Sequence, residues 1–176
     1  MFTIQPMDAE YYRSQTRRST LIICAILAAL CFLMASASIA LFGGAEGSNF
    51  RWNLAGVIAG VLLTIAVVRY FLWEQPWMAP AAYGFRLKRN LMKVTNILHQ
   101  VEAGAAADDP VAMRVLRFYH LGLLQMHTLE DNSTAISDMV GKIDLHRARM
   151  LEQGLDPEQN SLDPAWLEDI RSRWGK

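Results

Sequence analysis

The chain has 176 residues, and its 17 Lys and Arg are balanced by 17 Asp and Glu, so its net charge at pH 7 is zero. This length suits about one domain, and the balanced charge favours no particular class of partner. The apolar residues are unevenly distributed, because most of them lie between Leu21 and Trp73.

Two long apolar stretches predict a transmembrane hairpin. Leu21 to Phe42 contains 22 residues and no charge, and a helix of that length spans roughly 33 Å, which covers the hydrocarbon core of a bilayer. Trp52 to Trp73 is a second such stretch, interrupted only by Arg69 near its end. Two such runs in tandem, both flanked by aromatic residues, favour membrane spans over buried helices of a soluble protein. Neither run holds an acidic residue, which argues against a proton-coupled transporter or an ion pathway.

A cleaved signal peptide is the alternative interpretation of the first stretch. Ala35-Ser36-Ala37 has the A-x-A form of a cleavage site. However, the leading region of 20 residues is long and carries Asp8 and Glu10, and the apolar stretch continues to Phe42. These features favour an uncleaved span.

Small residues within the spans offer packing positions. Gly56 and Gly60 form a small-xxx-small motif, which lets two helix backbones approach closely. The motif is consistent with packing inside the hairpin, with a contact between two chains, or with neither. The first span has candidate matching positions at Ala25, Ala29, Ser36 and Ala40.

The two cysteines, Cys24 and Cys31, both fall in the first span. Seven helical residues separate them by roughly 10 Å, which is too far for a disulfide within one helix. We interpret them as small packing residues, with lipidation or a redox role as the alternatives.

The connection at residues 43–51 is expected to be a short turn facing away from the cytoplasm. Gly43, Gly44 and Gly47 supply turn residues. The polar and aromatic side chains that follow suit the membrane–water interface and its aromatic belt. They are Asn49, Phe50, Arg51, Trp52 and Asn53.

Basic residues predict the orientation. The connection between the spans holds only Arg51, whereas both outer flanks are rich in cations. The positive-inside rule therefore predicts that both termini are cytoplasmic. The flanking cations are Arg13, Arg17 and Arg18 on one side and Arg69, Arg86, Lys88, Arg89 and Lys93 on the other. Arg86, Lys88, Arg89 and Lys93 are candidates for contact with anionic headgroups, although a solvated basic face that only sets topology explains them equally well.

Residues 74–176 predict a helical domain. Pro76 and Pro80 separate it from the second span. A helix is expected over about residues 81–101, because apolar residues recur there at spacings of three and four. These residues are Leu87, Leu91, Val94, Leu98 and Val101.

Three further helices are expected after residue 101. Asp109-Pro110 suits the start of a helix that runs to about residue 129 and is apolar over most of its circumference, as a central bundle helix is. A third helix follows to about residue 153, with Gly154 at its end. Asp163-Pro164 starts a short last helix. No strand is predicted.

Residues that could carry chemistry are few. His120 and His127 lie seven residues apart on one predicted helix, next to Tyr119. Ligands on a helix normally lie three or four residues apart, so direct metal chelation by this pair is disfavoured. His99 and His146 could join them only through the fold. The common catalytic and nucleotide-binding motifs are absent from the sequence, and no face alternates aromatic and basic residues as nucleic-acid binding requires. We therefore predict no catalytic residue, cofactor, metal, nucleic acid or small-molecule substrate.

Three segments resemble a family of small, largely gammaproteobacterial proteins, domain of unknown function 3087. They are "YYRSQTRRST", "NFRWNLAGV" and "VLRFYHLGLLQMHTLEDN". The resemblance covers nearly the whole chain and implies a two-span protein of a Gram-negative inner membrane. The family has no assigned activity, so no site residue is transferred, although the resemblance suggests that residues 49–53 act as a unit.

These patterns together predict an all-α membrane protein, in which a two-helix transmembrane hairpin precedes a cytoplasmic helical bundle of three to four helices. The predicted divisions are residues 1–20, 21–73 and 74–176, with spans at 21–42 and 52–73. The leading hypothesis is a non-enzymatic protein of the bacterial inner membrane whose bundle binds another protein or itself. The alternatives are an accessory subunit held in a larger complex through its spans, and an enzyme with an unrecognised site around Tyr119, His120 and His127.

Overall fold

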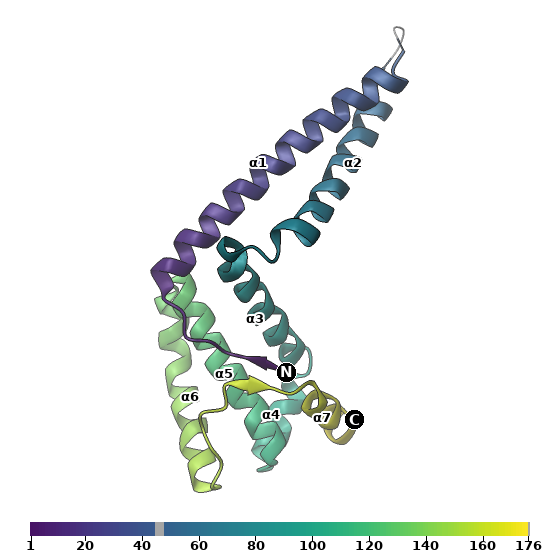
Figure 1. The fold of residues 1–176 in the computed structure, drawn as a ribbon. Coiled ribbons are helices and arrows are strands. Elements are labelled where there is room, and N and C mark those ends of the chain that lie inside the picture. The colour runs from purple at the N-terminus through teal and green to yellow at the C-terminus, as the bar shows by residue number, and fades with distance from the viewer. Residues whose placement is uncertain (45–47, 176) are drawn as a thin grey trace. The chain divides into compact units, whose positions relative to one another are not determined.

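The computed structural model of the chain describes residues 1–44 and 48–175 (Figure 1). It is 80% helical with seven α-helices in these ranges, which confirms the predicted all-α class. The elements in chain order are β1 (Phe2–Thr3), α1 (Ala9–Phe42), α2 (Phe50–Val67), the π-helical turn η1 (Val68–Leu72), the 3-10 turn η2 (Pro76–Met78), α3 (Ala79–Thr95), α4 (Leu98–Ala106), α5 (Pro110–Glu130), α6 (Ser133–Glu152), β2 (Ser161–Leu162) and α7 (Pro164–Trp174).

The chain divides into two compact units. The first, which we call the hairpin, is Ser14–Ala82. The second, which we call the helical domain, joins Met1–Arg13 to the chain from Tyr83 onward. Residues 1–13, which belong to the segment predicted at 1–20, therefore share a folded unit with the last helices.

In the hairpin, α1 and α2 run side by side in opposite directions (Figure 1). Helix α1 begins at Ala9, before the expected Leu21, because no Gly or Pro interrupts residues 9–42. Helix α1 and the continuous stretch Phe50–Leu72 are both long and apolar enough to cross a membrane. Only 6% and 17% of their most apolar windows are buried, whereas a core helix of a soluble protein is mostly buried. The predicted turn residue Gly47 lies outside the described residues.

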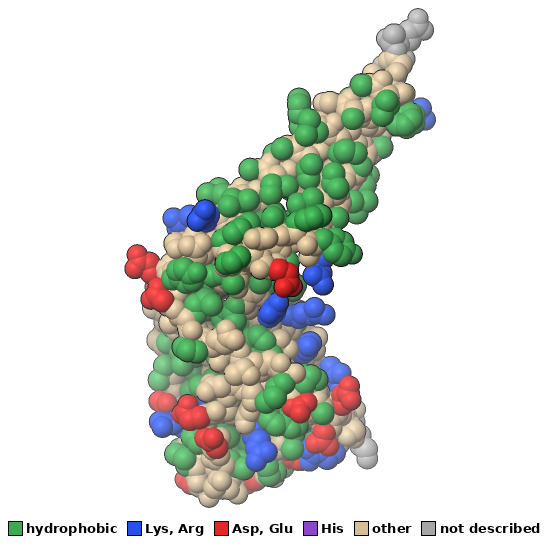
Figure 2. All heavy atoms as spheres, in the orientation of Figure 1, with side chains coloured by type: hydrophobic (Ala, Val, Ile, Leu, Met, Phe, Trp, Pro, Cys, Tyr) green, Lys and Arg blue, Asp and Glu red, His purple; other side chains and the backbone are tan. Residues whose placement is uncertain are grey.

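Apolar side chains cover the outward surface of both hairpin helices, as the green spheres over α1 and α2 in Figure 2 show. Phe32 is 72% exposed and Leu62 is 62% exposed. Exposed apolar surface on this scale is costly in water and is the expected surface of a membrane-spanning helix.

The helical domain is organised around α5, whose Met113, Val115 and Phe118 are fully buried. Asp109 caps this helix, because its Oδ1 accepts hydrogen bonds from the backbone N–H groups of Val111 and Ala112, at 2.9 Å each. Pro110 occupies the first turn, where the missing N–H costs nothing. The predicted start of this helix is therefore confirmed. Asp163 caps α7 in the same way.

The expected helix over residues 81–101 is wrong in one respect, because the structure divides it into α3 and α4. The hydroxyl of Thr95 donates to the carbonyl of Leu91 at 3.0 Å, and the N–H of Ile97 donates to Val94, a tighter turn than an α-helix makes. A Thr hydroxyl that bonds back to the helix carbonyls in this way tends to bend the helix. The change of direction lets Val94, Ile97 and Val101 all lie in one core.

The prediction that the chain has no strand is also wrong. Phe2–Thr3 pairs antiparallel with Ser161–Leu162, with Phe2 opposite Leu162. The N–H of Ile4 extends the pairing to the carbonyl of Asn160 at 2.8 Å. Strands of two residues are too short to show the alternation by which a strand is recognised in sequence.

The N-terminal strap (residues 2–5) is held by side chains as well as by strand pairing. The Phe2 ring stacks on Tyr83, at a centroid distance of 6.2 Å, and meets Phe118 edge-on at 6.3 Å. The hydroxyl of Tyr83 accepts from the N–H of Gln5 at 3.1 Å and donates to its carbonyl at 3.2 Å. The strap therefore completes the core of the helical domain.

Phe2→Ala is expected to destabilise the helical domain by about 2 kcal/mol, because it removes a half-buried aromatic side chain from the core. Thermal unfolding of the full chain in detergent, followed by circular dichroism, measures the effect. Thr3→Ala is the matched control, since Thr3 lies in the same strand with an exposed side chain. Equal melting temperatures for the two variants would contradict the role assigned to the strap.

Candidate functional site

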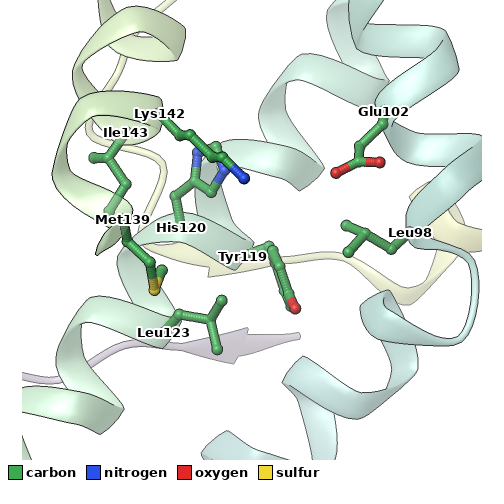
Figure 3. Close-up of a pocket in the computed structure, with 8 residues that line it drawn as sticks. All are labelled: Leu98, Glu102, Tyr119, His120, Leu123, Met139, Lys142 and Ile143. Atoms are coloured by element: carbon green, nitrogen blue, oxygen red, sulfur yellow. The ribbon is translucent and has the colours of Figure 1, made fainter. Parts of the chain in front are cut away.

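One candidate site is a pocket of about 170 Å³ between α4, α5 and α6 of the helical domain. Its wall is mainly apolar, with four polar side chains among the lining residues. Pockets of this composition are the usual hypothesis for a small-ligand site. The lining residues are Leu98, Glu102, Tyr119, His120, Leu123, Met139, Lys142 and Ile143 (Figure 3).

The polar groups of the pocket come from all three helices. In Figure 3, Lys142 of α6 extends past the His120 ring, and Glu102 of α4 points toward it from the opposite side. The Tyr119 hydroxyl lies 3.4 Å from the hydroxyl of Thr95, within hydrogen-bond reach. A neighbouring hollow shares Glu102, His120 and Lys142 and adds His146 and Arg149 to its lining.

His120 and His146 form the titratable centre of this region. Their rings meet edge-on with centroids 5.3 Å apart. The Nε2 of His146 lies 2.9 Å from the carbonyl of Met113, so this nitrogen carries the proton and donates. The Nδ1 of His120 is buried and has no hydrogen-bond partner among the described residues. Both imidazoles are therefore held as neutral rings in a poorly solvated place.

Burial and positive surroundings set the protonation of this pair. Desolvation is the main cause that lowers the pKa of His120 to about 4, with contributions from His146, Arg117 and Lys142. Desolvation also lowers the pKa of His146, and Arg117 and Arg149 act in the same direction, against the hydrogen bond to Met113. At neutral pH the pair therefore offers hydrogen bonds without charge.

Arg117 is a buried cation beside this pair, with 4% of its surface exposed. Its Nε donates to the carbonyl of Pro157 at 2.7 Å, while its Nη1 has no partner among the described residues. Burial lowers the pKa of this guanidinium. Because Pro157 lies in the segment between α6 and β2, Arg117 fixes that segment to α5.

Only some of the histidine and tyrosine side chains named from the sequence line these two hollows. The structure brings together Tyr119 and His120, and adds His146, whereas His99 and His127 do not line the pocket. Within the described residues, no three His, Cys, Asp or Glu side chains are grouped closely enough to hold a metal ion. The arrangement can bind a small, largely apolar molecule and give it one or two hydrogen bonds.

The two glycines of the hairpin lie against the backbone of α1. A Cβ at Gly56 would lie 2.5 Å from the Cα of Ala35, and one at Gly60 would lie 2.6 Å from the Cα of Cys31. The thiol of Cys31 reaches the carbonyl of Val57 at 3.7 Å. Such contacts are possible only where one helix lacks side chains. The small residues Ala25, Ala29, Ser36 and Ala40 are instead exposed and are not brought to the glycines.

Within residues 49–53, Asn49 and Trp52 make contacts inside the hairpin, and the other three residues are exposed. The Asn49 side chain accepts from the N–H of Gly44 at 3.2 Å and donates to its carbonyl at 3.3 Å. Trp52 stacks on Phe42 with a centroid distance of 5.0 Å. Phe50, Arg51 and Asn53 are exposed. Asn49 and Trp52 therefore tie the two helix ends together.

The four basic residues proposed for headgroup contact lie on α3. Lys88 forms an ion pair with Glu130 at the end of α5, and this hydrogen bond is the main cause that raises the pKa of Lys88. Arg86, Arg89 and Lys93 are exposed and take part in none of the ion pairs found among the described residues.

Comparison with known proteins gives a family and no activity. The family model described as "Protein of unknown function (DUF3087)" matches residues 2–167. No curated protein and no solved structure matches the chain significantly.

Gly60→Leu is expected to separate α1 from α2, because its side chain would meet the backbone at Cys31. Pulsed electron resonance between spin labels at Leu33→Cys and Leu62→Cys, with both native cysteines changed to alanine, should report a longer and broader distance. Gly141→Leu is the control, since nothing lies within 4 Å of a Cβ at that glycine. An unchanged distance in the Gly60→Leu chain would show that the glycine contact does not hold the helices together.

Stability of the helical domain is expected to fall as the pH drops from about 6.5 to about 4. In this window the unfolded chain protonates His120 and the folded chain does not, so protons favour unfolding, at a cost of about 3 kcal/mol. Chemical unfolding at a series of pH values measures the slope. His120→Phe should flatten it, whereas His99→Phe, at an exposed position, should not. Identical slopes for the native chain and His120→Phe would refute the assignment.

Proposed function

The chain belongs to the DUF3087 family, and we propose that this member is a membrane-anchored interaction module. The hairpin crosses the bacterial inner membrane twice, and the helical domain lies on the cytoplasmic side. There the domain binds another protein or a second copy of this chain. Its role is to hold a partner at the membrane surface.

The observation that carries the proposal is the composition of the helical domain. Its N-terminal strap and its helices from Tyr83 onward come from opposite sides of the hairpin in the sequence. Two segments that share one core must lie on the same side of a membrane. An even number of crossings between them meets this condition, and two apolar helices are available to make them.

Surface chemistry supports membrane anchoring of the hairpin. The apolar side chains of α1 and α2 face outward, and lipid would cover them at no cost in unsatisfied backbone groups, because both segments are helical. The cytoplasmic orientation follows from the basic flanks, with Arg13, Arg17 and Arg18 before the first apolar stretch and only Arg51 between the two.

An accessory-subunit role has its own support in the hairpin. An apolar groove of about 270 Å³ runs between α1 and α2 and is lined in part by Ala37, Ser38, Ala55 and Ala59. Small residues of this kind allow a third helix to approach closely in a membrane. In that case the spans, rather than the helical domain, would hold the partner.

A C-terminally tagged chain, purified from native membranes in mild detergent and examined by mass spectrometry, is expected to bring down a stoichiometric protein or a defined oligomer. The chain with residues 81–176 removed and the tag after residue 80 should insert but lose that partner. Ala37→Leu with Ala55→Leu, which fills the groove, should retain it.

The opposite pattern, loss with the filled groove and retention without the helical domain, would favour the accessory subunit. A tagged chain that is recovered in the soluble fraction would refute membrane anchoring altogether.

A further inference from the structure

We propose that the exposed face of α3 lies on the anionic lipid headgroups of the membrane that holds the hairpin. This inference rests on the proposed membrane anchoring and adds to it a lipid-binding surface on the helical domain. The surface consists of Phe85, Arg86, Arg89, Met92 and Lys93, which we call the α3 basic face.

Helix α3 has two sharply different sides. Leu87, Leu91 and Val94 are buried in the core, with at most 3% of their surface exposed. At about 100° per residue, the five residues of the α3 basic face fall within an arc of roughly 120° on the side opposite to the core. Arg86, Arg89, Met92 and Lys93 on this side are exposed.

The apolar members of this face are large and exposed. Phe85 is 55% exposed and Met92 is 63% exposed. They lie among Arg86, Arg89 and Lys93, and α3 contains no acidic residue. Exposed aromatic and aliphatic groups among long basic side chains form the pattern by which helices bind the boundary between headgroups and acyl chains.

The charges of the α3 basic face are available to an external anion. The ammonium of Lys88 pairs with Glu130 from α5, which removes that residue from the set named from the sequence. Lys93 donates to the neutral side chain of Asn90, at 3.3 Å. Among the described residues, Arg86, Arg89 and Lys93 take part in none of the ion pairs. Phosphate oxygens of anionic lipids match these three cations.

Chain connectivity keeps this helix close to the bilayer. Helix α3 starts at Ala79, and the second apolar stretch ends at Leu72. The intervening residues, 73–78, span at most about 20 Å even when fully extended. The start of α3 therefore stays near the surface at which the second span leaves the membrane.

A spin label at Met92→Cys tests the proposal in the full chain with Cys24→Ala and Cys31→Ala. The chain is reconstituted in nanodiscs of phosphatidylcholine alone, or with about one quarter phosphatidylglycerol. Collision with oxygen reports lipid contact, and collision with a water-soluble nickel chelate reports exposure to water. Leu33→Cys on α1 and Ser137→Cys on α6 serve as the lipid and water references.

The Met92 label is expected to favour oxygen when phosphatidylglycerol is present. Arg86→Gln, Arg89→Gln and Lys93→Gln together should return it to water, with its partition into lipid falling roughly fivefold per charge. Arg114→Gln, Arg147→Gln and Arg171→Gln are the matched control, which removes the same charge from exposed positions on other helices and should have no effect.

A Met92 label that meets the nickel chelate in both membranes would overturn the proposal, and so would one that neither reagent reaches, because a second chain then covers the face. If the Leu33 label reports lipid in these cases, membrane anchoring stands and only the α3 proposal fails. A Leu33 label in water would instead remove the anchoring on which both depend.

Discussion

The structure depends on the pairing of its first residues with its last strand. Phe2 lies opposite Leu162 and packs on Tyr83 and Phe118, so the chain returns to its own beginning after the two apolar helices. The hairpin is therefore inserted in sequence between two segments of one folded domain. Both ends of the hairpin therefore connect to the same core, in which the rings of Phe2, Tyr83 and Phe118 pack together.

Helix α5 forms the apolar centre of the helical domain and also carries polar side chains that are buried there. Its buried positions carry Met113, Val115 and Phe118, as a central helix requires, and yet the same helix buries Arg117 and holds His120 beside His146. Burying these groups costs solvation, and the lowered pKa values of all three record that cost. The carbonyls of Met113 and Pro157 offset part of it, because each accepts a hydrogen bond from one of these side chains.

Much of the helical framework could be predicted, because it rests on local signals. Pro and Asp at the helix starts, uncharged runs long enough to span a bilayer and apolar spacings of three and four all act over a few residues. What was missed depends on contacts between distant residues. The sequence around Phe2 does not indicate that it pairs with Leu162. The sequence around His120 likewise does not indicate that its ring packs against that of His146. No Gly or Pro marks the break after Thr95, and the small residues of the first span do not by themselves show which of them meet Gly56 and Gly60.

The strap also sets the order in which the protein can mature. Phe2 is synthesised well before Leu162, so the strap has no strand to pair with until Ser161 and Leu162 have left the ribosome. Helices α1 and α2 are synthesised between β1 and β2, so they are complete before the strap can form its strand pairing. A chain whose synthesis stops before residue 161 would lack β2 and leave the backbone of the strap without its strand partner.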